Sequence, residues 1–130
     1  MADETRQALL RRWNKAVILV GLAGSVMLEE FQAAGFPVAV EAFADRRYQK
    51  NGSLRPRKFE DSVLYDPKEA AAQAMRIVAQ GSVVAVDGGV VPLTAQTICI
   101  HGDTPGAPEI AAAVHRTLAK AGIEIKSLTK

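Results

Sequence analysis

Two short polar stretches of this chain carry residue types suited to acid–base chemistry. The first contains Glu41, Asp45, Arg46 and Tyr48, and the second contains His101. Each stretch begins where an apolar, strand-like run ends. In parallel α/β sheets, the loops beyond the strand C-termini are where ligands and catalytic groups gather. The pattern therefore predicts that the two stretches border one cleft at the C-terminal end of a sheet.

Several reactive residue types in the sequence also have an ordinary structural explanation. Asp45 could pair with Arg46 or Arg47 at the surface, which contributes little to stability. His115 lies off the apolar stripe of its predicted helix and is expected to be solvated. Cys99 sits within an apolar strand and is expected to be a small core residue rather than a nucleophile.

The loop after the first stretch is rich in cations. Its basic residues are Arg46, Arg47, Lys50, Arg55, Arg57 and Lys58. The planar guanidinium group suits both carboxylates and phosphates, so an anion site is expected here. Arg46 and Arg55 are the better candidates and Arg57 is next, whereas Lys50 and Lys58 are expected to be solvated.

The second stretch continues with Gly102 and Asp103. Gly102 would let the backbone approach a ligand closely. Asp103 could orient the ring of His101, although capping the following helix is the favoured role. No phosphate-binding glycine loop ending in Lys-Ser/Thr and no Cys-x-x-Cys or His-Glu-x-x-His metal motif occurs in the sequence.

The segments that would position these residues alternate between strands and helices. The strands are predicted at Ala16–Val20, Val38–Glu41, Val83–Val86, Val90–Leu93, Thr97–Ile100 and Ile123–Ile125. The helices are predicted from Asp3 to Asn14, from the cap Ser25 to Ala34, from the cap Asp66 to Gln80, and from near Pro105 or Pro108 to the residue before Gly122. This alternation predicts an α/β fold with a mainly parallel sheet and flanking helices. The turn residues Asp87-Gly88-Gly89 predict a small β-hairpin inserted into it.

Composition is that of an ordinary globular domain. The chain has 130 residues, of which 48% are hydrophobic and 23% charged, so residues 1–130 are expected to form a single domain. A net charge of +2 argues against nucleic acid as a partner. One cysteine and no apolar run of membrane-spanning length favour a protein of the reducing cytoplasm.

Four strings carry a resemblance to a known family. They are Val20-Gly21-Leu22-Ala23-Gly24-Ser25, Glu41-Ala42-Phe43-Ala44-Asp45-Arg46 with Tyr48, Gly52-Ser53-Leu54-Arg55-Pro56-Arg57, and Thr97-Ile98-Cys99-Ile100-His101-Gly102-Asp103-Thr104-Pro105. In order and spacing they resemble the C-terminal half of the LamB/YcsF family, the A subunits of bacterial 5-oxoprolinase. Family members are longer, and their N-terminal half carries an Asp-Leu-Asn-Cys-Asp string that is absent here.

The resemblance implies a fold and an activity. The fold would be part of a seven-stranded β/α barrel of the glycoside hydrolase and deacetylase kind. The activity would be the ATP-dependent hydrolysis of 5-oxo-L-proline to L-glutamate, with Mg²⁺ as a possible companion of ATP and with the B and C subunits as partners. This chain alone is expected to be inactive, since half of the family's motifs are missing.

The resemblance also implies roles for individual residues. The expected catalytic residues are Glu41, Asp45 and His101. The expected substrate- or phosphate-binding residues are Arg46, Tyr48, Arg55, Arg57, Gly102 and Asp103. No metal ligands are expected in this chain.

Two other functions stay open at this point. The chain could be a truncated, non-catalytic fragment or interaction module, or a metal-dependent amide or carbohydrate hydrolase by analogy of fold.

A half barrel would leave sheet edges unpaired, so a homodimer or a complex with a complementary N-terminal half is expected through Ala16–Val20 or Ile123–Ile125. Alternatively, the first helix could cover the open face through Leu9, Leu10 and Trp13 and give a monomer.

Overall fold

The computed structural model describes residues 17–128 together with Glu4 and Ala8. The helix predicted over Asp3–Asn14, and with it the expected cover of the sheet by Leu9, Leu10 and Trp13, lies almost entirely outside the described residues.

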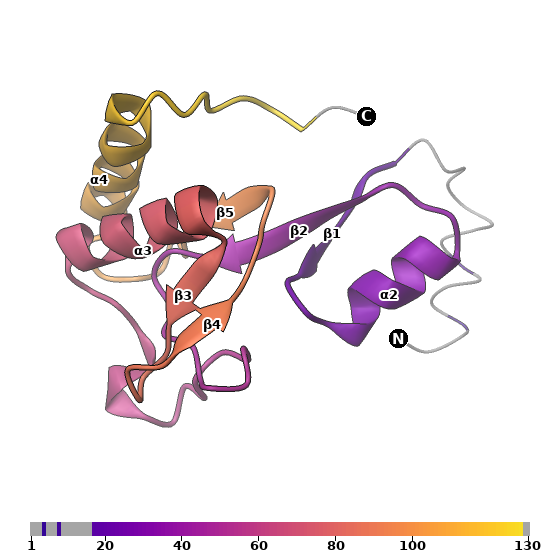
Figure 1. The fold of residues 1–130 in the computed structure, drawn as a ribbon, viewed down its shortest axis with the longest axis horizontal. Helices are drawn as coiled ribbons and strands as arrows, with labels where there is room; N and C mark the ends of the chain where they lie inside the picture. Colours follow the sequence, from indigo (N-terminus) through magenta and orange to yellow (C-terminus); the bar gives the residue numbers. More distant parts are fainter. Residues whose placement is uncertain (1–3, 5–7, 9–16, 129–130) are drawn as a thin grey trace.

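Three parallel strands form the main sheet. Strands β1 (Leu19–Leu22), β2 (Val38–Phe43) and β5 (Thr97–Cys99) lie in the order β1-β2-β5, so β2 is central (Figure 1). Phe43 lies opposite Cys99 in the register of β2 and β5. The C-terminal ends of these two strands are therefore neighbours, as the sequence predicted.

The inserted hairpin is also confirmed. Strand β3 (Ser82–Val84) pairs antiparallel with β4 (Val90–Pro92), and the backbone N–H of Ala85 donates to the carbonyl of Gly89 across the turn. The two strands form a separate two-stranded sheet beside the main one.

The helices begin and end close to the predicted positions. Helix α2 (Val26–Ala33) begins at the cap Ser25, whose hydroxyl accepts from the N–H of Leu28 at 3.3 Å. Helix α3 (Pro67–Gln80) begins at Asp66, whose carboxylate accepts from the N–H of Lys68 at 2.9 Å.

The C-terminal half of the fold adds α4 and a short connecting helix. Helix α3 ends at Gly81, which adopts a left-handed φ of 62° that a glycine tolerates without strain. Helix α4 covers Ala107–Lys120, and a 3₁₀ turn, η1, covers Glu60–Ser62 in the long loop between β2 and α3.

The strand predicted at Ile123–Ile125 is wrong. After the turn at Gly122 the chain runs without secondary structure to residue 128, and Figure 1 shows it leaving α4 as a single extended trace. A strand requires a neighbour to receive its backbone hydrogen bonds, and none among the described residues pairs with this segment. Ile123 packs against the core, whereas Ile125 is 51% exposed.

Helices α3 and α4 pack together and against one face of β5 and the end of β2. The larger core cluster contains Ala44, Leu64, Ala70, Ala71, Ala74, Ile110, Ala113, Val114 and Leu118. The alanines of α3 let the two helices approach closely, and they account for much of this cluster. Because side chains alternate along a strand, Glu41, Phe43 and Cys99 are directed to the opposite face. That face carries the polar ends of β2 and β5.

Candidate active site

An aspartate and a histidine from the two strand ends form the centre of the site. Asp45 follows β2 and is fully buried, and His101 follows β5. The ring Nδ1 of His101 lies 3.0 Å and 3.1 Å from the two carboxylate oxygens of Asp45. The backbone N–H of His101 donates to the same carboxylate at 2.9 Å, and the Thr104 hydroxyl donates at 3.1 Å.

These donors keep the buried carboxylate ionised. Burial by itself would raise the pKa of Asp45, because an apolar surrounding disfavours charge. The hydrogen bonds from the backbone and ring of His101, its charge and the Thr104 hydroxyl together lower the pKa of Asp45 below its ordinary value. The sequence-based alternative of a surface pair with Arg46 or Arg47 is wrong, since Asp45 is buried and its carboxylate bonds His101 and Thr104.

The imidazole of His101 is fixed on two sides. Its ring stacks on Phe43 with centroids 4.8 Å apart and planes 19° apart, while Asp45 holds Nδ1. The side chain is 23% exposed, so the ring is neither sealed in the core nor free in solvent. A carboxylate that accepts from Nδ1 selects the tautomer with a lone pair on Nε2. This arrangement can take up and return a proton at Nε2.

The loop that carries Asp45 is held by a residue that the sequence did not point to. The side-chain amide of Gln73, on α3, donates to the carbonyls of Phe43 at 2.9 Å, Ala44 at 3.3 Å and Arg46 at 2.8 Å. Two of these carbonyls flank Asp45 directly. No local signal in the sequence could have found this contact, because it joins residues 27 to 30 positions apart.

Glu41 lies within β2, two residues before the strand ends and on the same face as Phe43. Burial, followed by the charge of Glu41 and a hydrogen bond to it, raises the pKa of the Cys99 thiol to about 11. Such a thiol is almost fully protonated at neutral pH. Cys99 is thus unsuited to nucleophilic chemistry, as expected. It is half-buried on the face opposite the core, however, so its predicted place in the core is wrong.

Arg46 is occupied by the loop itself. It is 6% exposed, and its guanidinium donates to the carbonyl of Ser62 at 3.3 Å and that of Arg55 at 2.7 Å. Burial and the nearby charge of Arg57 lower its pKa. The side chain thus ties the two arms of the loop together.

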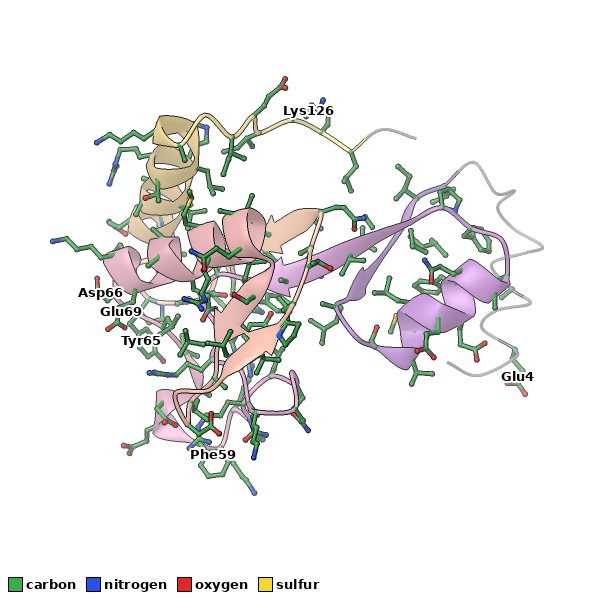
Figure 2. The ribbon with its side chains drawn as sticks, viewed as in Figure 1. Glu4, Phe59, Tyr65, Asp66, Glu69 and Lys126 are labelled. Atoms are coloured by element: carbon green, nitrogen blue, oxygen red, sulfur yellow. The ribbon has the colours of Figure 1, made fainter. Side chains whose placement is uncertain are left out.

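Arg55 is engaged as well. Its Nε lies 2.6 Å from the carboxylate of Asp61, and its guanidinium carbon lies 4.1 Å above the centre of the Phe59 ring. Figure 2 labels Phe59 at the outer end of this loop. Arg57 is exposed in the same loop.

The remaining candidates differ in their surroundings. Tyr48 is 1% exposed, its hydroxyl accepts from the N–H of Phe43 at 2.9 Å, and burial raises its pKa.

Gly102 and Asp103 are exposed on the turn before α4. The capping role favoured for Asp103 is wrong, because α4 begins at Gly106 without a side-chain cap. The His101 ring is oriented by Asp45 instead.

A cavity of about 570 Å³ lies between the turn after β1 and the inserted hairpin. Its walls include Gly24, Ser25, Asn51 and Thr94, and none of the nine residues expected to act in catalysis or binding lines it.

In the part of the chain that is described, no three His, Cys, Asp or Glu side chains gather as a metal site would require. Nor does any helix there have the length and apolar character needed to cross a bilayer.

Comparison with known proteins decides the family. The sequence matches the LamB/YcsF family over residues 1–130. The chain belongs to this family. Among curated relatives, the 5-oxoprolinase A subunit of Thermus thermophilus is 45% identical over 127 residues, and that of Chloroflexus aurantiacus is 48% identical over 115 residues.

A solved LamB/YcsF relative shares the fold. The crystal structure of the lactam utilization protein from Thermus thermophilus superposes with a TM-score of 0.87 at 42% identity, covering 96% of this chain. The chain covers 51% of that structure, 51% of the first curated relative and 46% of the second. It therefore spans about half the length of the relatives it matches.

Proposed function

We propose that this LamB/YcsF chain supplies the acid–base pair of a 5-oxoprolinase, as part of the A subunit that hydrolyses 5-oxo-L-proline to L-glutamate with ATP and with B and C subunits. The observation that carries the proposal is the contact between Asp45 and His101. The names of the relatives, which describe 5-oxoprolinase and lactam utilization, support the choice of substrate.

Opening a lactam requires proton transfer at two points. Water must lose a proton as it attacks the carbonyl carbon, and the ring nitrogen must gain one as the C–N bond breaks. His101 can do both at Nε2, because Asp45 fixes Nδ1 and stabilises the imidazolium. Acid–base catalysis of this kind contributes about 10²–10⁴-fold. Glu41, on the same face two residues before the end of β2, is proposed as a second proton acceptor.

ATP would supply the activation that a stable amide needs, by phosphorylating the lactam oxygen with release of ADP. Attack of water on the activated carbon would then expel inorganic phosphate and open the ring. The cations of the loop after β2 fit a polyphosphate. Arg57, Lys50 and Lys58 are exposed there, and none forms an ion pair with another described residue. Arg57 is the candidate that best matches a phosphate, because Arg46 and Arg55 already have partners.

The three-stranded sheet is proposed to be part of a seven-stranded β/α barrel. Within the described residues, β1 and β5 each have β2 as their sole neighbour, so each could pair further. The other strands would come from a complementary N-terminal half, which corresponds to the relatives' additional length, or from a second copy of this chain. The polar face that carries Asp45 and His101 would then be directed into the barrel.

Reconstitution tests this function. We would measure glutamate and ADP release from 5-oxo-L-proline by the chain alone, and then with the N-terminal half of the Thermus relative and with the B and C subunits. The proposal predicts turnover only in the complete mixture with ATP. Turnover without ATP would instead favour a metal-dependent amide hydrolase, and no turnover in any mixture would favour a non-catalytic module.

A further inference from the structure

One arginine of the basic loop has a buried donor without a partner. The Nε of Arg47 is shielded from solvent and forms no hydrogen bond to any described residue. Buried polar atoms in folded proteins are almost always paired, so an exception at a candidate site calls for a ligand. The backbone of Arg47 is well fixed: its N–H donates to the carbonyl of Ser62 at 2.9 Å, and its carbonyl accepts from the N–H of Arg55 at 2.8 Å.

Arg47 lies two residues after Asp45, in a segment that tertiary contacts hold in place. Two antiparallel bridges join Arg46 to Val63 and Tyr48 to Leu54, and the chain bends at Asp45. Tyr48 packs in the core beneath the hairpin. Two residues of chain span at most about 7 Å, so the Arg47 backbone lies within that distance of Asp45.

The neighbouring guanidinium groups already have hydrogen-bond or ionic partners. Arg46 donates to backbone carbonyls, and Arg55 is paired with Asp61. The pKa of Asp61 is lowered mainly by the hydrogen bond from Arg55 and, to a smaller extent, by the charge of Arg47. The Nε of Arg47, in contrast, has no partner among the described residues.

We propose that Arg47 binds the carboxylate of 5-oxo-L-proline and makes the site specific for lactams that carry one. This inference rests on the proposed function. An arginine pairs side-on with a carboxylate through Nε and one Nη, a geometry that requires an unoccupied Nε. The carboxylate and the lactam carbonyl of 5-oxoproline are attached to the two carbons that flank the ring nitrogen. A molecule of that size bridges the interval between Arg47 and the Asp45–His101 pair.

Nitrogen-15 NMR of the full chain can detect this contact directly. The Nε–H signal of Arg47 is assigned by its loss in Arg47→Lys, and the probes are 5-oxo-L-proline, 2-pyrrolidinone, which lacks the carboxylate, and inorganic phosphate. We expect 5-oxoproline to shift the Arg47 signal and 2-pyrrolidinone to leave it unchanged. In Arg47→Met the Kd for 5-oxoproline should rise at least about tenfold, while that for 2-pyrrolidinone stays constant. Arg116→Met, on the exposed surface of α4, is the matched control and should bind as the wild type does.

The possible results distinguish the role of Arg47 from the proposed function on which it rests. Equal affinity of the wild type and Arg47→Met for 5-oxoproline would overturn the role of Arg47 and leave the proposed function standing. A shift with phosphate but not with 5-oxoproline would also overturn it, because the anion would then be a phosphoryl group. If neither lactam binds to the chain or to its complex with the complementary half, the proposed function itself fails. Arg47→Lys retains the charge and should lose less affinity than Arg47→Met, provided that both melt at the wild-type temperature.

Discussion

The carboxylate of Asp45 holds the imidazole of His101 across 56 positions of sequence, with 3.0 Å between Oδ1 and Nδ1. The contact exists because β2 and β5 are parallel neighbours whose C-terminal ends lie side by side. A buried carboxylate on one strand end thus orients a partly exposed base on the next.

The tautomer of His101 follows from this contact. Asp45 accepts from Nδ1, so the neutral ring should carry its proton there and leave Nε2 bare. The chain has two histidines, and His115 on the exposed side of α4 serves as the internal reference. Ring nitrogen-15 shifts above about pH 8 should show the Nδ1–H form for His101 and a mixture for His115. A predominantly Nε2–H ring at His101 would contradict the assignment.

Acid should weaken the fold through Asp45. The pKa of this carboxyl is lower in the folded chain than its ordinary value, so its contribution to stability is present above the unfolded pKa of about 3.9. That contribution is lost as the pH falls through the folded pKa. Urea unfolding at several values between about pH 7 and pH 3 should show a steeper loss for the wild type than for Asp45→Asn. Glu69→Gln, at an exposed position on α3 labelled in Figure 2, should behave as the wild type.

Gln73 should matter for both stability and activity. Gln73→Met keeps the length of the side chain but leaves three carbonyls without their donor. We expect the free energy of unfolding to fall by about 1–3 kcal/mol. Glutamate formation by the reconstituted complex should also fall, because the loop carrying Asp45 loses its anchor. The control is Gln80→Met at the exposed end of the same helix, and equal effects of the two substitutions would refute the role of Gln73.

Cys99 should be an unreactive thiol. With a pKa of about 11, it should react with an alkylating reagent near pH 7.5 about 100-fold more slowly than the same cysteine in the chain unfolded in urea. Glu41→Gln removes a negative charge that raises this pKa, so it should speed the reaction. An unchanged rate in Glu41→Gln would show that the two side chains are not coupled.

Local signals in the sequence were enough for most of the framework. Ser25 and Asp66 cap helices as predicted, and the hairpin forms around Asp87-Gly88-Gly89. These features depend on residues close together in the chain. The strand predicted at Ile123–Ile125 failed because an alternating pattern does not supply a pairing partner.

The site was predictable only in outline. The predicted strand ends put Asp45 and His101 at the same edge of the sheet. The residue types alone, however, could not distinguish a surface ion pair from a buried acid–base pair. Arg46 and Tyr48 match the family strings, yet the Arg46 side chain bonds within the loop and the Tyr48 hydroxyl bonds the last residue of β2. The anchor Gln73 and the unpaired Nε of Arg47 depend on tertiary packing, which no short motif records.

The central claim is that the Asp45–His101 pair performs the proton transfers of lactam hydrolysis. The most direct test is the rate of ATP-dependent glutamate release from 5-oxo-L-proline in the reconstituted complex, with His101→Gln and Asp45→Asn compared with His115→Gln. We predict that the first two lower the rate by at least about 100-fold while His115→Gln retains the wild-type rate. Near-wild-type turnover by folded His101→Gln would contradict the account.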